Sequence, residues 1–395
     1  MSGPLTGLKV LDFSALLPGP FATLMLAGVG ADVLRVESPS RPDMVRMLPP
    51  MATDGNSAAH GYLNRSKRSI GIDMKSPAGL EIVKRLVAEY DIVVEQFRPG
   101  VMERLGVGYE ALKAINPKII YVSITGYGQT GPYKDRAGHD MNYLAIAGVL
   151  GYNGRKASGP APMAVQVADI AGGSCHAVIG LLAAVIHRQA TGIGQHVDIS
   201  MTDAAFSLHA LTAPGALNGG DKPGLENTQL NGGSFYDCYE TADGRYFSVG
   251  GLEPQFFMQF CAAIGRPELA PLGLNMLQAD VVAQLKAEIQ LEMKKKTYDE
   301  WSTIFAALDS CTEPVLSFAE ATEHPHIKAR ELLVEVPMGN GQTQRQLASP
   351  IKFSETKAQY AYTGVTLGEH TEAVMKAAGF SEDEITQAKR SGAIA

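Results

Sequence analysis

Cysteines, charged side chains and long apolar runs are all scarce in this 395-residue sequence, in which 19% of the residues are charged. None of its four cysteines lies in a C-x-x-C pair, so neither a disulfide framework nor a metal or redox site of that spacing is expected. They are Cys175, Cys238, Cys261 and Cys311, and we expect reduced thiols, which fit a cytoplasmic protein. The longest apolar run, residues 177–186, is far short of the ~20 residues of a membrane span, and the N-terminus lacks the pattern of a signal peptide. We therefore expect no membrane partner.

Positive charge is scarce as well, since the net charge is -7 at pH 7. The chain thus lacks the extended basic field that nucleic-acid binding needs, and no nucleic-acid partner is expected. One local basic cluster could clamp phosphate groups through charge-assisted hydrogen bonds, or it could be an ordinary solvated surface. The cluster comprises Arg65, Lys67, Arg68 and Lys75, with Arg98 and Arg104 further along the chain.

The first 200 residues alternate short β-branched runs with helical patterns, which predicts an α/β fold with a mainly parallel sheet. Ligands of such sheets bind outside the carboxyl ends of the strands. The loop after the first strand reads L-L-P-G-P-F and not G-x-G-x-x-G, so no nicotinamide enzyme is expected. We expect strands over residues 8–13, 31–36, 91–95, 119–124 and 195–199, and helices over 20–27, 77–89, 101–115 and 169–189.

The pattern changes after residue 231, where a β-hairpin is followed by three helices. These elements are expected over residues 235–239, 245–249, 255–264, 280–295 and 298–308. We therefore predict a smaller α+β domain, joined by two linkers to a large domain built from both ends of the chain. The limits are 232–320 for the small domain, 201–231 and 321–339 for the linkers, and 1–200 with 340–395 for the large domain. Its last part is expected to be extended and polar before a helix over 369–390.

Three residues could carry chemistry. His139 follows the fourth strand in the segment G-H-D-M-N-Y; its imidazole could transfer protons near neutral pH, or it could only satisfy buried polar groups. Asp169 begins a helix, where it could be an N-cap worth ~1 kcal/mol or an acid–base partner of His139 at the same sheet edge. Glu253 follows the predicted hairpin and could orient a histidine or favour a helix N-terminus through the dipole.

Ordered segments over nearly the whole chain resemble the family III coenzyme A transferases, and among them the α-methylacyl-CoA racemases. The segments are residues 4–10, 28–33, 97–106, 126–132, 239–246 and 323–327. The resemblance implies an interlocked homodimer of chains with a Rossmann-like large domain and a small domain, and an active site between the large domain of one subunit and the small domain of the other. Coenzyme A would bind on the large domain as part of the substrate, with no further cofactor and no metal.

Carried over residue by residue, the resemblance also implies a set of coenzyme A contacts. Ser38 stands where the family has an arginine, so Arg41 becomes a candidate in its place, and Arg65 is a candidate from the basic cluster. The other implied contacts are Ile72, Asp73, Met74, Lys75, Gln96, Phe97, Arg98, Arg104, Gly138, Asp140, Asn142, Tyr143, Gly172 and Gly173.

Two chemistries are found in the family. Its transferases use the aspartate at the position of Asp169 as a nucleophile and generally lack a histidine at the position of His139, so the sequence resembles the racemases. We expect a racemase of 2-methylacyl-CoA thioesters in which His139 and Asp169 exchange the α-proton through an enolate, while Glu253 orients His139. Backbone N–H groups at the helix start near Asp169 are expected to bind the enolate oxygen. The alternatives are a CoA-transferase with an aspartyl intermediate at Asp169 and a non-catalytic acyl-CoA-binding protein.

Overall fold

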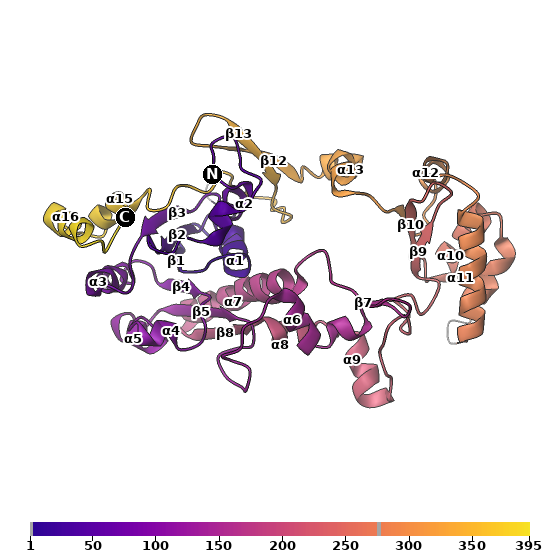
Figure 1. The fold of residues 1–395 in the computed structure, drawn as a ribbon, viewed down its shortest axis with the longest axis horizontal. Coiled ribbons are helices and arrows are strands. Elements are labelled where there is room, and N and C mark those ends of the chain that lie inside the picture. The colour runs from indigo at the N-terminus through magenta and orange to yellow at the C-terminus, as the bar shows by residue number, and fades with distance from the viewer. Residues whose placement is uncertain (1–2, 275–277) are drawn as a thin grey trace. The chain divides into compact units, whose positions relative to one another are not determined.

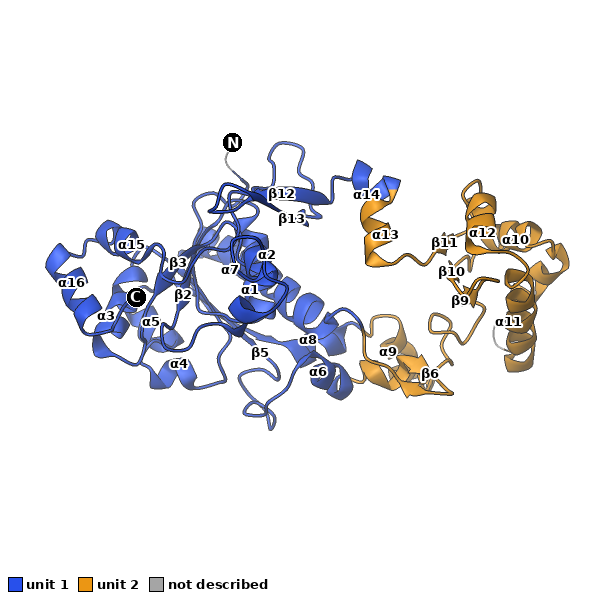
Figure 2. Cartoon of the chain, turned by 45° about the horizontal axis from the view of Figure 1, so that its top comes forward, with its two compact units in different colours: residues 1–147, 164–208, 325–395 blue, residues 148–163, 209–324 orange. Residues whose placement is uncertain are grey.

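The structure is a computed structural model that describes residues 3–274 and 278–395, and the chain divides into two compact units (Figure 2). Unit 1 contains the residues up to Ala147 together with Ala164–Leu208 and Pro325–Ala395. Unit 2 contains Gly148–Met163 and His209–His324.

Two segments lie outside the parts in which the sequence placed them. Residues 148–163, expected in the large domain, join unit 2, where Arg155 forms ion pairs with Glu226 and Asp237. Residues 325–339, expected as linker, join unit 1, because strand β12 (Leu333–Pro337) pairs there with β13 (Thr343–Leu347).

A six-stranded sheet, parallel throughout, forms the centre of unit 1 (Figure 1). Its order is β3-β2-β1-β4-β5-β8, and ligands of open α/β sheets bind where such an order reverses, here between β1 and β4. Val10 and Leu11 of β1, whose side chains lie on opposite faces, are both fully buried, as expected of a parallel sheet covered on both faces. The strands are β1 (Lys9–Asp12), β2 (Asp32–Glu37), β3 (Arg68–Gly71), β4 (Ile92–Glu95), β5 (Ile120–Thr125) and β8 (His196–Ser200). The predicted α/β fold with a mainly parallel sheet is confirmed.

Helices cover this sheet and begin where the sequence supplies caps. At the start of α3, Ser76 Oγ accepts the N–H of Gly79 (2.9 Å), and Pro77 occupies the first turn. The helices of unit 1 are α1 (Pro18–Ala27), α2 (Ala58–Leu63), α3 (Pro77–Leu86), α4 (Val101–Arg104), α5 (Tyr109–Ile115), α6 (Asp140–Ile146), α7 (His176–Thr191), α8 (Met201–Ser207), α14 (Pro325–Ala329), α15 (Thr371–Ala377) and α16 (Glu382–Arg390). A 3-10 turn, η1 (Met44–Met47), and a π-helical segment, η3 (Ala168–Cys175), complete the set, and η3 leads directly into α7.

Several elements of unit 1 differ from the predicted ones. The helix expected over 101–115 is divided into α4 and α5, because Gly106 has φ +78° and interrupts it. In the same way Gly379, at φ +77°, divides the helix expected over 369–390 into α15 and α16. Strand β3 was not predicted, since its sequence R-S-I-G has only one β-branched residue.

Unit 2 contains a three-stranded antiparallel sheet, β11-β10-β9, packed against helices. The predicted hairpin is present, with Phe247 of β10 opposite Tyr239 of β9. Phe235, Phe260 and Trp301 are almost fully buried in its core. The elements are η2 (Val149–Tyr152), β6 (Gly154–Arg155), β7 (Gly159–Pro160), α9 (Thr212–Pro214), η4 (Gly215–Gly219), β9 (Asp237–Glu240), β10 (Tyr246–Val249), α10 (Pro254–Ala263), η5 (Pro267–Leu274), α11 (Ala279–Met293), α12 (Tyr298–Phe305), β11 (Thr312–Pro314) and α13 (Phe318–Glu323).

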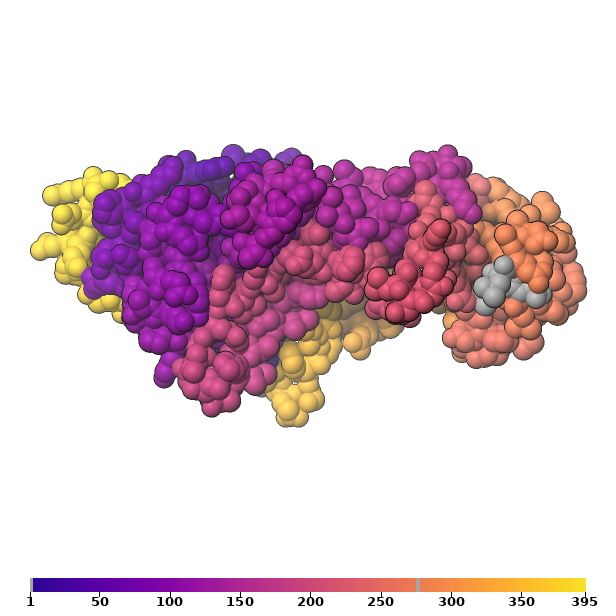
Figure 3. Space-filling view, turned by 90° about the horizontal axis from the view of Figure 1, so that it is seen from below, coloured from indigo at the N-terminus to yellow at the C-terminus, as the bar shows by residue number. Residues whose placement is uncertain are grey.

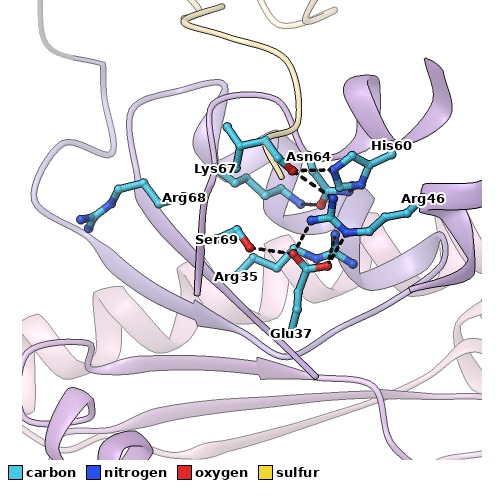
Figure 4. Close-up of a pocket in the computed structure, with 9 residues that line it drawn as sticks. Arg35, Glu37, Arg46, His60, Asn64, Lys67, Arg68 and Ser69 are labelled. Atoms are coloured by element: carbon cyan, nitrogen blue, oxygen red, sulfur yellow. Dashed lines mark hydrogen bonds and ion pairs between the residues drawn. The ribbon is translucent and has the colours of Figure 1, made fainter. Parts of the chain in front are cut away.

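A charge network is buried on one face of β1, β2 and β3, and Figure 4 shows a large part of it. Side chains two residues apart in a strand share a face, and Asp12, Arg35 and Ser69 are neighbours across the three strands. The three cations of the network balance its three carboxylates, as burial of charge requires. Its members are Asp12, Arg35, Glu37, Asp43, Arg46 and Lys67.

Glu37 lies at the centre of this network. Its carboxylate accepts hydrogen bonds from Arg46 Nε (2.8 Å) and Ser69 Oγ (2.8 Å) and lies 3.3 Å from Arg35 Nη1. Burial alone would raise the pKa of Glu37, but the hydrogen bond from Arg46 and the charge of Arg35 outweigh it and lower the pKa to about 2. The ionised carboxylate therefore stabilises the fold.

We expect Glu37→Gln to lower the free energy of unfolding by about 3 kcal/mol at pH 7, because the shift in pKa is worth ~1.4 kcal/mol per unit and two arginines lose their counter-charge. The folded pKa is lower than the unfolded one. The contribution of the carboxylate is therefore complete above pH 4.5 and is lost as the pH falls through about 2. Urea unfolding followed by circular dichroism at pH 7 and pH 3 measures the difference.

The matched control is Glu89→Gln, which removes an exposed ion pair with Lys9 and should cost less than ~0.5 kcal/mol. A destabilisation by Glu37→Gln that is the same at both pH values would contradict the assignment.

Candidate active site

The loops that follow β1 and β4 at the carboxyl edge of the sheet are joined to each other and to η3. The N–H of Gly19 donates to Gln96 Oε1 (2.9 Å), which links the first turn of α1, reached by the loop after β1, to the loop after β4. Ser174 Oγ in η3 donates to the carbonyl of Pro18 (2.6 Å). The start of α1 thus connects η3 to the edge where sheets of this type bind ligands.

Asp140, the first residue of α6, connects that helix to η3. One oxygen of its carboxylate accepts the N–H groups of Ala168 (2.7 Å) and Asp169 (3.0 Å). These N–H groups carry partial positive charge at a helix start, so a carboxylate is favourable there. Asp169 is therefore not the N-cap of its helix: the cap position is Val167, and Asp140 satisfies the first N–H groups. The same contact brings His139, the preceding residue, beside Asp169.

His139 and Asp169 are close enough for their charges to interact. Burial raises the pKa of Asp169, the charge of Asp140 raises it further and His139 lowers it, with a result of about 6. Asp169 is half-buried and His139 is exposed. A carboxyl group that titrates near pH 6 is present in both forms near neutrality, so it can both accept and deliver a proton.

Tyr143 fixes the backbone that carries His139. Its hydroxyl donates to the carbonyl of Gly138, and its ring fills the space beside Gly126 and Gly138. A Cβ atom would lie 2.4 Å from the Tyr143 ring if added at Gly126 and 2.6 Å if added at Gly138, so a side chain at either position would force the ring to move. The ring of Tyr127 packs edge-on against it. The surface of this part of unit 1 is seen in purple to pink in Figure 3.

Arg98 and Asn142 are predicted contacts that lie in the same place. Burial and the charge of Asp169 raise the pKa of Tyr143 to about 12. The charge of Arg98 opposes this shift in pKa, so Arg98 lies near enough to the Tyr143 hydroxyl for its charge to be felt there. Asn142 Oδ1 accepts the N–H of His139 (3.0 Å). The structure therefore brings Arg98 and the segment 138–143 together with Asp169.

Other predicted contacts are engaged elsewhere. The guanidinium of Arg65 is buried and donates to Gln346 Oε1 (3.3 Å) and to the carbonyl of Leu347, so it is not available to a phosphate. Ile72 is fully buried in the core and its N–H donates to the carbonyl of Glu37 (2.8 Å), so this residue too is engaged within the fold. Burial of the Arg65 side chain could not be predicted from the sequence, because arginine is rarely buried.

The remaining contacts implied near β3 and β4 are spread along the sheet edge. The carboxylate of Asp73 accepts the N–H of Lys75 (3.0 Å), and Lys75 is exposed. Met74 and Phe97 pack on the core of unit 1. Arg41 is also exposed, and Arg104 lies beside Gly100 in α4. Their role in binding coenzyme A stays a prediction.

Gly172 and Gly173 allow η3 to pack closely on its neighbours. A Cβ atom on Gly173 would lie 3.1 Å from the side chains of Pro18 and Met201, and one on Gly172 would lie 3.2 Å from the carbonyl of Met201. Close packing thus accounts for both glycines, and their predicted contact with coenzyme A stays a prediction.

The N–H groups expected to bind an enolate oxygen at the start of η3 are already bonded. Those of Ala168 and Asp169 bind Asp140, and that of Ile170 binds the carbonyl of Gln166 (2.9 Å). The predicted oxyanion site is therefore wrong as stated, because a neighbouring carboxylate occupies it.

Two features of the site were missed from the sequence. The P-G-P segment at residues 18–20 forms the first turn of α1, and it was interpreted only as excluding a dinucleotide motif, although proline in a first turn is itself a helix-start signal. Nothing in the sequence indicates that Asp140 raises the pKa of Asp169, because the two residues are 29 positions apart.

Glu253 belongs to unit 2, where it occupies the cap position of α10 and is exposed. Its predicted contact with His139 stays a prediction. Within residues 3–274 and 278–395, no group of three or more His, Cys, Asp or Glu side chains is placed to hold a metal ion.

Comparison with known proteins gives a consistent set of relatives. The family model described as CoA-transferase family III matches residues 5–371. The alpha-methylacyl-CoA racemase of Mus musculus is 35% identical over 97% of this chain and 95% of its own length. The succinate–glutarate CoA-transferase of Agrobacterium fabrum is 34% identical over 94% of this chain and 95% of its own length. The crystal structure of a CAIB/BAIF family protein from Brucella suis, 32% identical, superimposes with a TM-score of 0.82 and covers 96% of this chain and 100% of that one.

We expect Asp140→Asn to lower the pKa of Asp169 below its value of about 6, because the substitution removes a neighbouring negative charge while its amide oxygen can still accept the two N–H groups. Carbon-13 NMR titration of labelled aspartate carboxyl groups measures the shift, with Asp169→Asn to identify the resonance. The control is Asp135→Asn, which changes an exposed aspartate in the loop before α6 and should leave the pKa of Asp169 unchanged. An unchanged pKa in Asp140→Asn would show that Asp140 does not govern it.

Proposed function

The chain belongs to CoA-transferase family III, and we propose that it is a racemase or epimerase of 2-methylacyl-CoA thioesters. The reaction would move the hydrogen on the carbon next to the thioester carbonyl from one face to the other. The similarity to the mouse racemase over nearly the whole chain supports the proposal, as does the presence of His139, which the family's transferases generally lack.

The pairing of His139 with Asp169 is the observation that carries the proposal. An α-hydrogen beside a thioester is weakly acidic, and a racemase needs one proton carrier on each face of that carbon. His139 would remove the proton from one enantiomer, and protonated Asp169 would deliver a proton to the opposite face. For the other enantiomer the roles reverse. A pKa of about 6 supports both roles for Asp169 at neutral pH.

Coenzyme A would lie along the carboxyl edge of the sheet, with its thioester at His139 and its nucleotide toward Ile72–Lys75. In the strand order, β3 is four positions from β5, a span of about 19 Å at ~4.8 Å per strand. An extended ligand would cover that span. Arg98 follows β4, which lies between the two ends, and its exposed guanidinium is available to a phosphate.

We propose that the reaction needs no cofactor beyond the coenzyme A of the substrate, because the two side chains supply both proton transfers. We also propose that the protein is cytoplasmic, with its cysteines reduced. Both statements rest on the sequence.

A CoA-transferase is the second candidate, and the similarity to the succinate–glutarate CoA-transferase favours it. In this reaction the carboxylate of Asp169 would attack the thioester and form a mixed anhydride with release of coenzyme A. Its half-exposed side chain is accessible to such a reaction.

The racemase proposal predicts that the protein incorporates solvent deuterium at the α-carbon of a chiral 2-methylacyl-CoA with no acceptor acid present. His139→Ala and Asp169→Asn should each lower the racemisation rate by ~10²–10⁴-fold, since each removes one positioned proton carrier. Proton NMR of the thioester in deuterium oxide and chiral analysis of the acid measure both processes.

The two directions should also differ in pH dependence. Turnover of the enantiomer whose proton Asp169 removes should fall below pH about 6, and turnover of the opposite one should fall above it. If the substrate keeps its hydrogen and configuration while Asp169 becomes covalently modified in mass spectra with an acceptor acid present, the transferase is the correct function. Tight binding with neither activity would indicate a binding protein.

We also propose that the protein is a homodimer, in which Glu253 of one subunit would orient His139 of the other.

An exposed apolar helix face supports the dimer. Helix Ala168–Thr191 is long and apolar enough to cross a membrane, although core helices of soluble proteins also meet that test, and 39% of its most apolar stretch is buried in the chain. Its exposed side chains include Ile179 and Ile186, at 63% and 67% exposure. Residues seven apart share a helix face, and such an exposed apolar stripe marks an interaction surface.

We expect the double variant Ile179→Glu/Ile186→Glu to sediment as a monomer, because burial of two carboxylates against an apolar partner is unfavourable. Analytical ultracentrifugation should give twice the chain mass for the wild type. The control Ile115→Glu changes an exposed isoleucine on α5 and should stay dimeric. A monomeric wild type, or a double variant that remains dimeric, would contradict this interface.

A further inference from the structure

We propose that Lys67 is a positioning residue of the active site, whose buried ammonium group holds the turn Pro18–Gly19–Pro20 and, through it, the helix that carries Asp169. The inference rests on the proposed function only in taking Asp169 as a catalytic group. Lys67 itself is almost fully buried.

The ammonium group of Lys67 has all three of its hydrogens engaged. Nζ donates to the carbonyl of Pro20 (2.8 Å), to Thr23 Oγ1 (2.7 Å) and to Asn64 Oδ1 (3.1 Å), and the residue is 1% exposed. Two of these acceptors belong to the first turns of α1. Figure 4 shows the Lys67 side chain directed toward Asn64 in the interior of the network. Loss of the ammonium group would leave buried acceptors without a donor.

Charge keeps this lysine in place as well. Its Nζ lies 3.5 Å from Asp12 Oδ2. Burial lowers the pKa of Lys67 to about 7, and the charge of Asp12 opposes that shift. Asp12 has further donors, the N–H of Ser14 (2.9 Å) and the hydroxyl of Thr23 (2.5 Å), so it would not be left alone if Lys67 became neutral.

The turn that Lys67 holds is the first turn of α1, and its three residues are buried. Pro18 and Pro20 have no N–H group, so Gly19 supplies the only N–H within these three residues, and it binds Gln96. The carbonyl of Pro18 accepts the hydroxyl of Ser174 (2.6 Å). The turn is therefore fixed on three sides: by Lys67, by the loop after β4 and by η3.

Ser174 passes this restraint to Asp169. The same hydroxyl that binds Pro18 also lies 3.1 Å from the carbonyl of Asp169, and Ser174 is fully buried. Gly173, next to it, packs directly on Pro18. A shift of the turn would therefore move the backbone of Asp169, and small displacements of a catalytic group reduce turnover strongly.

The test is Lys67→Met, which keeps the length and the apolar stem of the side chain and removes the ammonium group. We expect faster hydrogen–deuterium exchange in peptides that cover residues 14–24 and 167–176, measured by mass spectrometry. We also expect kcat for 2-methylacyl-CoA racemisation to fall by about 10- to 100-fold, with a smaller change in KM. In a double-mutant cycle with Ser174→Ala, the two losses in kcat should not multiply, because both variants break the same connection.

Arg188→Met is the matched control. Arg188, in α7, is also a largely buried cation, and it donates to the carbonyls of Asp91 (3.1 Å) and Lys118 (3.2 Å) before the amino ends of β4 and β5. It should change neither the exchange of residues 167–176 nor kcat. If Lys67→Met does not fold, Thr23→Val replaces it as the test, because it removes one acceptor of the ammonium group at nearly constant volume. Thr23→Val should give the same increase in exchange and decrease in kcat, but smaller in size.

The outcomes separate this inference from the proposed function. Unchanged exchange of residues 167–176 in Lys67→Met, or losses that multiply with those of Ser174→Ala, would overturn the role of Lys67. A wild-type protein that does not racemise the thioester would refute the proposed function, and the exchange measurements would still decide whether Lys67 positions η3.

Discussion

The carboxylate of Asp140 is the contact on which the rest of the site depends. By binding the first two N–H groups of η3 it joins the helix that begins after His139 to the helix that contains Asp169. The same charge disfavours ionisation of Asp169 and contributes to its raised pKa. One ionised group thus sets both the position and the proton affinity of a second. A neutral residue of the same shape would retain only the first effect.

The parallel sheet determines the position of the site, and the buried charge network on β1, β2 and β3 stabilises that sheet. The buried network of β1–β3 binds η1, α1 and the segment before β3 to one face of the sheet. Its cost in desolvation is offset because each carboxylate has both a cation and a hydrogen-bond donor. The loops at the carboxyl edge therefore begin at strands that are held firmly in place, although several of these loops contain proline and glycine.

Much of this arrangement could be predicted from the sequence, and the exceptions have physical causes. Five of the six parallel strands could be predicted because their β-branched runs are buried on both faces. His139 is indicated by its place after a strand end, and Asp169 by its place at the start of a helix and by the family resemblance. Helix boundaries were wrong where single glycines, Gly106 and Gly379, adopt left-handed conformations inside an amphipathic pattern. Arg65 was expected on the surface because the energy of a buried guanidinium depends on partners such as Gln346 and Leu347, which lie some 280 residues away in the sequence.

The π-helical form of η3 has a consequence for how this chain can change. A π-helix bonds each N–H to the carbonyl five residues earlier and so contains one residue more than an α-helical path between the same ends. If η3 adopted regular α-helical bonding with its present number of residues, the extra residue would turn Asp169 by about 100° around the helix axis relative to α7. Every side chain of the pair would still be present, yet His139 would face a different residue. The spacing, and not only the identity, of these residues is therefore under constraint.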